Sequence, residues 1–263
     1  MGILNVTPDS FSDGGRYLDP EAALDRARTM LAEGAEILDL GGESTRPGAE
    51  AVPLEEERRR VLPVLEALLE LAVPISIDTR KPELAEEALR LGAHLINDVT
   101  GLADPRMRAV AARYEAPAVV MHMPVPDPAR MMQHAHYLDV VAEVRAFLLA
   151  RAKRALLDGV PQVILDPGIG FGKKLHHNLA LLRRLNELAG LGFPLLVGAS
   201  RKRMIGELTG EKEPKKRVLG SVAAHLAAVA RGARIIRVHD VAAHRQALDV
   251  FWAIEGSDGP DRP

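Results

Sequence analysis

Eight short apolar runs recur along the chain, and a longer segment with helical spacing of its apolar residues follows each one. We predict that the runs are β-strands because they are short and rich in valine, isoleucine and leucine. Consecutive apolar residues are typical of parallel strands buried on both faces. The predicted strands are Gly2–Val6, Glu36–Leu40, Pro74–Asp78, Leu95–Val99, Ala118–His122, Gln162–Asp166, Leu195–Gly198 and Ile235–His239.

The segments between these runs predict eight helices, several of which begin at proline or aspartate and end near glycine, as helices often do. Strict alternation of strand and helix over about 250 residues is typical of a (β/α)8 barrel rather than of a doubly wound sheet. We therefore predict an α/β fold, a single-domain TIM barrel over residues 1–254 with a polar C-terminal tail over 255–263. The predicted helices are Pro20–Glu33, Leu54–Leu71, Pro82–Leu91, Pro105–Tyr114, Leu138–Leu157, Leu175–Ala189, Lys216–Arg231 and Val241–Ile254.

Each predicted strand ends at or near a polar or charged residue. A carboxylate or an imidazole gains nothing inside an apolar layer, whereas the C-terminal ends of TIM-barrel strands form one face that carries the active site. We therefore expect a concave polar site, and hence an enzyme. The polar residues at these ends include Asn5, Asp39, Asp78, Asn97, His122, Asp166, Ser200 and His239.

The charge and composition of the chain narrow the class of partner. Its 34 basic and 36 acidic residues give a net charge of -2, which argues against nucleic acid or an anionic membrane as the main partner. With no cysteine, the chain has no disulfides, thiolate nucleophile or cysteine-bound metal. No apolar run approaches the about 20 residues of a membrane span, and the start lacks the basic region of a signal peptide. We expect a cytoplasmic enzyme that acts on small molecules.

Two clusters near the last two strands predict an anion site. Ser200-Arg201-Lys202 follows the seventh strand and Arg237-Val238-His239 ends the eighth, where barrels of this class often bind phosphate. Arg237 and His239 are two residues apart and so lie on the same side of their strand. A guanidinium beside an imidazole suits an anion with several oxygens, such as diphosphate. The alternative is a surface ion pair and an isolated histidine.

Asp78, Asn97 and Asp166 end the third, fourth and sixth strands. They could bind a metal, act as acid and base, or hydrogen-bond a flat polar heterocycle. A site for a hard metal needs several converging carboxylates, whereas here an amide and Lys202 stand among them. This mixture of donors and acceptors favours the edge of a heteroaromatic ring. The alternative, polar residues of the barrel rim without a ligand, is plausible for one of them and poor for all three.

The loop Asp166-Pro167-Gly168-Ile169-Gly170-Phe171-Gly172-Lys173 has the glycine content of a phosphate-binding loop but not its spacing. Lys174 stands where a Walker A motif has serine or threonine, and the dinucleotide fingerprint is also absent. We interpret the glycines as a tight turn that lets the backbone approach a ligand. Phe171 is then available to pack against an aromatic ring.

Long segments resemble the signatures of the dihydropteroate synthase family of pterin-binding enzymes. GILNVTPDSFSDGG at 2–15 resembles its opening signature and GGESTRPG at 41–48 its second. Further segments of the family pattern recur in order over essentially the whole chain, namely Ser76-Ile77-Asp78-Thr79, Ile96-Asn97-Asp98-Val99, the loop 166–173, Ser200-Arg201-Lys202 and Arg237-Val238-His239.

The resemblance implies a transferase that joins p-aminobenzoate to 7,8-dihydropterin-6-ylmethyl diphosphate in folate biosynthesis, with Mg2+ as cofactor and a homodimer formed through the last helices. It implies that the pterin is held by Asp78, Asn97, Asp166 and Lys202. The implied diphosphate ligands are Asn5, Arg237 and His239, of which Asn5 also binds the Mg2+. The implied p-aminobenzoate pocket consists of Thr45, Arg46, Phe171 and Ser200. The implied catalytic residues are Asp13, Lys202, Arg237 and His239.

These substrates imply an SN1-like reaction. Diphosphate departs once Mg2+, Arg237 and His239 neutralise its charge, and the electron-rich pterin stabilises the remaining methylene cation. The loop over Thr7–Asp19, which carries Asp9, Phe11 and Asp13, would place Asp13 against this cation. The arylamine is neutral at pH 7, so the reaction needs no strong general base.

Three other activities share part of this pattern. A pterin-binding corrinoid methyltransferase has no use for the diphosphate ligands, a non-catalytic pterin-binding homologue would lose part of the site, and an aldolase or isomerase needs a base or Schiff-base lysine that we cannot place.

The chain also departs from the family pattern in two places. Its first strand begins at residue 2, which predicts an incomplete start or a simpler barrel floor, and 123–136 is rich in proline where relatives have a glycine-containing turn.

Overall fold

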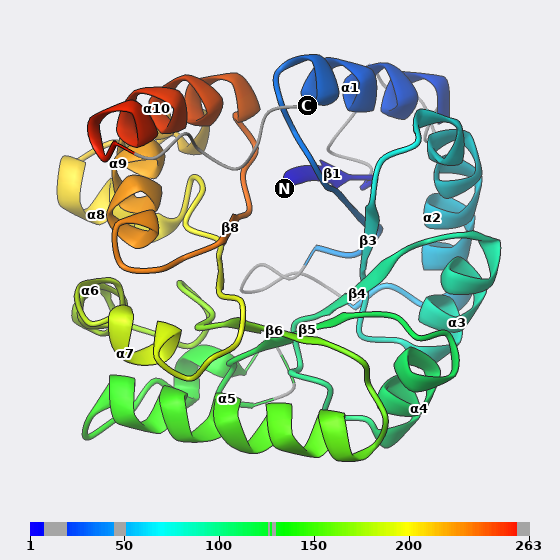
Figure 1. The fold of residues 1–263 in the computed structure, drawn as a ribbon, viewed down its shortest axis with the longest axis horizontal. Coiled ribbons are helices and arrows are strands. Elements are labelled where there is room, and N and C mark those ends of the chain that lie inside the picture. The colour runs from blue at the N-terminus through cyan, green and yellow to red at the C-terminus, as the bar shows by residue number, and fades with distance from the viewer. Residues whose placement is uncertain (8–19, 45–50, 126, 128–129, 257–263) are drawn as a thin grey trace.

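The computed structural model describes residues 1–7, 20–44, 51–125, 127 and 130–256. In this part of the chain, parallel strands alternate with helices, and the helices form a ring outside the strands (Figure 1). This arrangement is a single-domain TIM barrel, as the alternation of apolar runs and helical segments predicts. The strands are β1 (Gly2–Asn5), β2 (Leu38–Gly41), β3 (Ile75–Asp78), β4 (Leu95–Asp98), β5 (Ala118–Met121), β6 (Val163–Asp166), β7 (Leu196–Val197) and β8 (Ile235–Ile236).

The helices follow the predicted order with three differences. The predicted helix over 175–189 is interrupted after Arg183, and α8 was not expected, because its seven residues are too few to show an apolar period. The helix α5 begins at Val140, since the carboxylate of Asp139 accepts the N–H groups of Val141 and Ala142 and so caps it. The α-helices are α1 (Pro20–Ala32), α2 (Leu54–Leu68), α3 (Pro82–Leu91), α4 (Pro105–Arg113), α5 (Val140–Leu157), α6 (Leu175–Arg183), α7 (Asn186–Ala189), α8 (Arg203–Thr209), α9 (Val218–Val229) and α10 (Val241–Ile254), and the short 3-10 helices are η1 (Leu69–Leu71), η2 (Met131–His134) and η3 (Pro214–Lys216).

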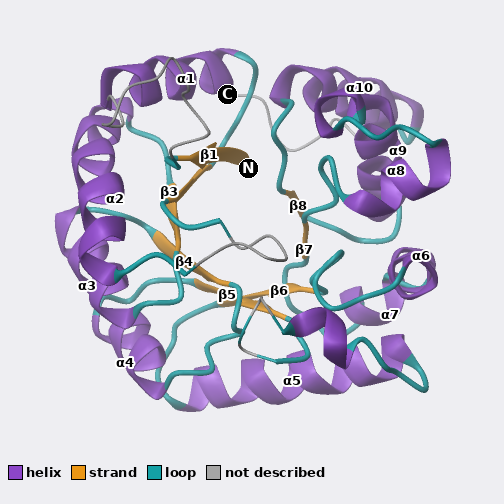
Figure 2. Cartoon of the chain, turned by 180° about the vertical axis from the view of Figure 1, so that it is seen from behind, coloured by secondary structure: helices purple, strands orange, loops and turns teal. Residues whose placement is uncertain are grey.

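Two sheets make up the barrel, and single residue pairs close it. Strands β1 to β6 form one sheet in chain order, and β7 pairs with β8 (Figure 2). Leu165 bridges to Leu195 between β6 and β7, and Gly2 bridges to Val238 between the end of β8 and β1. The strands that carry the predicted anion site are therefore paired with each other and joined to the larger sheet by narrow contacts.

Successive side chains along each strand point alternately outward, to the core under the helices, and inward, to the barrel interior. Ile77 and Ile96 pack outward with apolar residues of the surrounding helices. Leu95, Ile164 and Leu196 belong to a smaller apolar cluster inside the barrel. Residues two positions further along these strands face the same interior near its carboxyl end, which is where the polar side chains gather. Within the described residues, no helix combines the length and apolar character that a membrane crossing requires.

Candidate active site

The carboxyl ends of β1 to β4 place four residues in one row across the sheet. Strand pairing aligns Asn5 with Gly41, Gly41 with Asp78, and Asp78 with Asn97. A Cβ atom added to Gly41 would lie 3.2 Å from Cβ of Asp78, so any side chain there would crowd the carboxylate. Asp78 and Asn97 are buried and Asn5 is half-buried. The row therefore presents two amides and one carboxylate at the barrel mouth, and the Asp78 side chain packs closely over Gly41.

Arg237, which follows β8, reaches across β1 to this row. Its Nε atom donates to Oδ2 of Asp39 over 2.5 Å, and its second terminal nitrogen donates to Oδ2 of Asp78 over 2.7 Å. Nδ2 of Asn97 lies 3.3 and 3.2 Å from the two oxygens of Asp39. Asp39 is two residues before Gly41 on β2 and is fully buried. Arg237, Asp39, Asp78 and Asn97 thus form one hydrogen-bonded network, in which two carboxylates share one guanidinium.

Burial raises the pKa of two carboxyl groups at the barrel mouth. It raises the pKa of Asp78 to about 7, although the positive charge of Arg237 acts in the opposite direction. Burial also raises the pKa of Asp166, against the N–H group of Gly168 and the charge of Lys202. A carboxyl group that titrates near neutral pH accepts hydrogen bonds when ionised and donates one when protonated. Both forms suit the nitrogen-rich edge of a heterocycle.

The glycine-containing loop after β6 folds around the buried ammonium group of Lys173. Nζ of Lys173 donates to the carbonyl oxygens of Gly168 and Phe171, each at 2.9 Å, and to that of His122 at 3.3 Å. The same nitrogen lies 2.9 Å from Nδ1 of His122. Gly168 has a φ of +66°, and a Cβ there would lie 2.0 Å from the His122 carbonyl oxygen, so this turn requires glycine.

The ring of Phe171 is fixed at the edge of the site by this loop. Nζ of Lys202 lies 4.1 Å from the centre of the Phe171 ring, which is within the range of a cation–π interaction. A Cβ added to Gly170 would lie 3.0 Å from the Lys202 side chain. The loop after β6 and the turn after β7 therefore meet at a flat apolar surface with a positive charge above it.

Ser200, Arg201 and His239 connect the turns after β7 and β8. Oγ of Ser200 lies 2.9 Å from Nδ1 of His239 and accepts the N–H of His239 over 3.2 Å. The guanidinium of Arg201 binds both carboxylate oxygens of Asp240, with 2.9 Å between Nε and Oδ2. Arg201 has a left-handed φ of +58°, and its N–H donates to Oγ of Ser221 over 2.8 Å. These contacts hold the predicted anion-binding side chains against each other.

Glu43 anchors the start of the second signature loop. Its carboxylate accepts hydrogen bonds from Arg80 at 2.8 Å and from Lys81 at 2.7 Å, and these two cations lower its pKa against the opposing effect of burial. Lys81 also pairs with Glu57, which is fully buried. The polar surface beside this cluster is lined by Arg80, Lys81, Thr100, Ala103 and Asp104.

Most of the predicted site residues can be placed. Asp78, Asn97 and Arg237 share one network and Asn5 lies in the same row. Ser200 and His239 contact each other, as do Phe171 and Lys202, and Asp166 has the charges of Lys202 and Arg237 nearby. Predicted residues that lie outside the described part of the chain are Asp13, Thr45 and Arg46, together with Asp9 and Phe11 of the first loop.

Sequence reasoning assigned no role to Asp39, Glu43 or Lys173. Asp39 carried a usable signal, because a carboxylate inside an apolar strand needs a buried partner. Its position two residues before Gly41 also places it on the inward face of β2. The partners of Lys173 are mostly main-chain carbonyl groups, which no pattern of side chains reveals.

Comparisons with known proteins identify the family of the chain. The family model described as pterin binding enzyme matches residues 1–239. A protein of Neisseria meningitidis serogroup B named dihydropteroate synthase is 53% identical over 262 residues, which cover 97% of this chain and 92% of that protein. The dihydropteroate synthase of Escherichia coli K12 is 47% identical over 256 residues, covering 96% of this chain and 90% of its own length.

Solved structures show the same likeness. A crystal structure of dihydropteroate synthase from Thermus thermophilus in complex with 4-aminobenzoate has 66% sequence identity and a TM-score of 0.89, covering 97% of this chain and 93% of that one. A second structure of that enzyme, in complex with 6HMPPP, has 64% identity and a TM-score of 0.88 with the same coverage.

Proposed function

Because the chain belongs to the pterin-binding enzyme family and is a transferase of the dihydropteroate synthase type, we propose that it condenses p-aminobenzoate with 7,8-dihydropterin-6-ylmethyl diphosphate. The products are 7,8-dihydropteroate and diphosphate. The observation that carries the proposal is the pairing of Arg237 with Asp78 at 2.7 Å. A guanidinium suited to an anion thus lies beside the carboxylate of the ring site, so one substrate can span both.

The pterin occupies the mouth between Asp78, Asn97, Asp166 and Lys202. The buried carboxyl groups of Asp78 and Asp166 face the ring's N–H groups, and the Asn97 amide pairs with an edge that has one donor and one acceptor. Lys202 donates to a ring acceptor while its Nζ stays 4.1 Å from the Phe171 ring centre. A ring without the matching donors and acceptors would leave these buried side chains unpaired, which is costly. The site therefore rejects such rings.

The diphosphate lies against Asn5, Arg237 and His239. Asn5 stands at the end of β1, in the same row as Asp78 and separated from it by Gly41. Within the described residues, no group of three histidine or acidic side chains is placed to hold a metal ion by itself. A single amide ligand from the protein fits Mg2+, which keeps much of its hydration and is bound largely through substrate phosphates. When bound, Mg2+ would supply positive charge to the diphosphate oxygens.

The reaction breaks the bond between the methylene carbon and the diphosphate oxygen, and the electron pair leaves with diphosphate. Arg237 and His239 bind the charge that develops on this leaving group. The methylene cation is stabilised by the pterin ring and by Asp13 from the first loop. The nitrogen lone pair of p-aminobenzoate then forms the new C–N bond, and the nitrogen releases one proton to solvent or to the departing diphosphate.

The p-aminobenzoate pocket is formed by Thr45, Arg46, Phe171 and Ser200. Phe171 offers a flat apolar surface whose position is fixed by Lys173 beneath the loop. Thr45 and Arg46 follow Glu43 by two and three residues, and Glu43 is held by Arg80 and Lys81. Arg46 suits the carboxylate of the second substrate.

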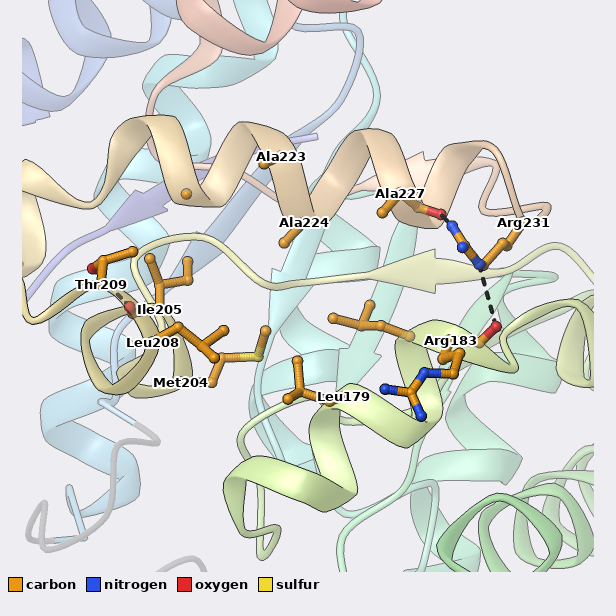
Figure 3. Close-up of a pocket in the computed structure, with 12 residues that line it drawn as sticks. Leu179, Arg183, Met204, Ile205, Leu208, Thr209, Ala223, Ala224, Ala227 and Arg231 are labelled. Atoms are coloured by element: carbon orange, nitrogen blue, oxygen red, sulfur yellow. Dashed lines mark hydrogen bonds between the residues drawn. The ribbon is translucent and has the colours of Figure 1, made fainter.

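We propose that the enzyme is a homodimer. A groove of about 420 Å³ lies outside the barrel between α6, α8 and α9, with apolar residues of α6 and α8 on one side and small residues of α9 on the other (Figure 3). Leu208 at its edge is 55% exposed, and exposed apolar surface of this kind commonly mediates association. Light scattering should show a dimer that Ala224→Arg in the groove disrupts and that Leu157→Arg, at an exposed leucine of α5, leaves intact. Dimers that resist Ala224→Arg would exclude this face.

We also propose that the enzyme acts in the cytoplasm, on small molecules and not on nucleic acid. The diphosphate ester is too highly charged to cross an apolar membrane, so the enzyme works in the compartment that makes it. The near balance of 34 basic and 36 acidic residues gives no surface charge for nucleic acid.

The test is to mix the protein with Mg2+, the pterin diphosphate and p-aminobenzoate and to follow diphosphate release. We expect release that requires, or is strongly stimulated by, the arylamine. Arg237→Met should abolish it, whereas Arg245→Met on the outer helix α10 should not. Release without stimulation by the arylamine, or none at all from the wild-type protein, would refute the proposal and favour a pterin-binding protein or a methyltransferase.

Two finer points have their own tests. Asp13→Asn should slow a single turnover without weakening the binding of the pterin diphosphate, and equal rates in both proteins would remove Asp13 from the reaction. Asn5→Ala should raise the Mg2+ concentration that is needed for half-maximal diphosphate binding. An unchanged Mg2+ dependence would remove Asn5 as the metal ligand.

A further inference from the structure

Two buried histidines that the proposed reaction does not use contact each other behind the anion site. His225 of α9 and His244 of α10 are 1% and 3% exposed. Nδ1 of His225 lies 2.8 Å from Nε2 of His244. Beyond this pair, Nε2 of His225 accepts the N–H of Ala199 over 2.9 Å, and Nδ1 of His244 lies 2.7 Å from the carbonyl oxygen of Asp240.

The two ends of this chain of hydrogen bonds fix the protonation of both rings. The Ala199 N–H can only donate, so Nε2 of His225 has no proton and its Nδ1 carries one. That proton is donated to Nε2 of His244, which in turn leaves the proton of His244 on Nδ1. The carbonyl oxygen of Asp240 can only accept, and it receives this last proton. This assignment satisfies all three contacts with both imidazoles neutral, and the main chain of Val197 and of Ser221 also faces the rings of His225 and His244.

We propose that His225 and His244 are positioning residues of the diphosphate site, which hold the turn after β7 and the turn after β8 in a fixed relation. Ala199 immediately precedes Ser200, and Asp240 immediately follows His239, so the histidine pair ties together the main chain on the far side of the contact between Ser200 and His239. This inference rests on the proposed function, because it assigns the two turns to diphosphate.

Main-chain pairing alone fixes these turns weakly. Strands β7 and β8 are two residues long, and their pairing ends at Val197 with Ile236, followed by one hydrogen bond from the Arg237 N–H to the Val197 carbonyl. Beyond that point, side chains join the two turns. Arg201 pairs with Asp240 across the two turns, and the histidine pair joins Ala199 to Asp240 through α9 and α10. Loss of the histidine pair would allow the turns to separate, and displacement of ligand groups by about 1 Å costs much of their contribution.

The test is His225→Phe, which keeps a flat ring and removes both nitrogens. We expect the dissociation constant of inorganic diphosphate, measured by calorimetry with Mg2+, and KM for the pterin diphosphate to rise about tenfold, as for other residues that orient a ligand group. KM for p-aminobenzoate should rise less, because of its proposed pocket only Ser200 lies on these turns, whereas Thr45, Arg46 and Phe171 lie on other loops. His94→Phe is the control for loss of an imidazole that accepts a main-chain N–H, since Nδ1 of the exposed His94 accepts that of Ile75 at 3.1 Å at the opposite end of the barrel.

Folded His225→Phe protein that binds diphosphate as tightly as wild type would overturn the inference, and so would an equal loss in His94→Phe. If His225→Phe does not fold, nitrogen NMR of wild-type histidines decides. Both rings should carry their proton on Nδ1 and shift when diphosphate binds, and a proton on either Nε2 would overturn the inference. Failure of the wild-type protein to bind or release diphosphate would instead refute the proposed function.

Discussion

The Nε atom of Arg237 donates a hydrogen bond to the carboxylate of Asp39 over 2.5 Å, although 198 positions separate the two residues in the chain. Asp39 is fully buried, and the Arg237 side chain is 21% exposed. Asp39 also accepts hydrogen bonds from Asn97. It therefore positions one residue of the proposed diphosphate site and one of the proposed pterin site.

Substitution Asp39→Asn should destabilise the fold by about 1–3 kcal/mol, because it weakens the buried hydrogen bonds of Asp39 with Arg237 and Asn97, although Asp78 still pairs with Arg237. The new amide nitrogen would also face the amide nitrogen of Asn97. Urea denaturation of both proteins measures the change. Glu70→Gln is the matched control, since its ion pair with Arg28 is more than half exposed and should contribute less than about 1 kcal/mol. Similar losses in the two variants would contradict the central role of Asp39.

Substitution Gly41→Ala tests the close packing of Asp78 over Gly41. Its Cβ would lie 3.2 Å from Cβ of Asp78, and crowding of this kind costs about 1–3 kcal/mol. We expect KM for the pterin diphosphate to rise about tenfold, because the carboxylate moves out of line with the ring. Gly190→Ala, at the end of α7, has ordinary space around it and should leave KM unchanged. A fully active Gly41→Ala enzyme would show that the site does not require glycine at this position.

Substitution Lys173→Met should loosen the loop that carries Phe171. It would leave the carbonyl groups of Gly168, Phe171 and His122 without their shared donor, at a cost of about 1–3 kcal/mol. Steady-state kinetics should show a higher KM for p-aminobenzoate and a smaller change for the pterin diphosphate. Lys174→Met, at the exposed neighbouring position, is the control. Equal effects on both substrates would mean that the loop does not act through Phe171.

The buried histidines should make the fold sensitive to acid. Burial lowers the pKa of His225 to about 3, helped by the facing charges of His244, the Met1 amino group and Lys202, and the pKa of His244 is lowered too, although Asp240 opposes the change. Between pH 6.5 and 3 the unfolded chain therefore binds more protons than the folded one. Stability falls as the pH decreases through this range, and His225 alone accounts for about 2 kcal/mol between pH 7 and pH 5.

The check is urea denaturation of wild type and His225→Phe at pH 7 and pH 5. The wild-type protein should lose about 2 kcal/mol more than the variant over this range. Parallel losses in the two proteins would show that His225 titrates normally in the folded state.

The strand positions could be predicted because short continuous apolar runs are typical of parallel strands that are buried on both faces. The same logic anticipates that Asp78, Asn97 and Arg237 meet, since inward residues at the ends of barrel strands have only one place to gather. The short helix α8 escapes prediction because seven residues beginning at Arg203 show no apolar period. The break between α6 and α7 escapes it because the apolar spacing continues across Arg184.

The histidine pair shows a different limit of sequence reasoning. His225 and His244 are 19 positions apart, a spacing that predicts no metal site, and their other partners are a main-chain N–H and a main-chain carbonyl group. Such contacts exist only after two helices have packed, so no pattern of residue types encodes them. The ion pairs of Glu43 with Arg80 and Lys81 are similar, because 37 and 38 positions separate the partners.

The two sheets of the barrel meet through the bridges Leu165–Leu195 and Gly2–Val238, and Arg237 spans the second of these seams through its ion pairs with Asp39 and Asp78. The guanidinium proposed to bind the leaving group therefore also joins the last strand to the second and third. Replacement of Arg237 should accordingly weaken the closure of the barrel as well as the binding of diphosphate.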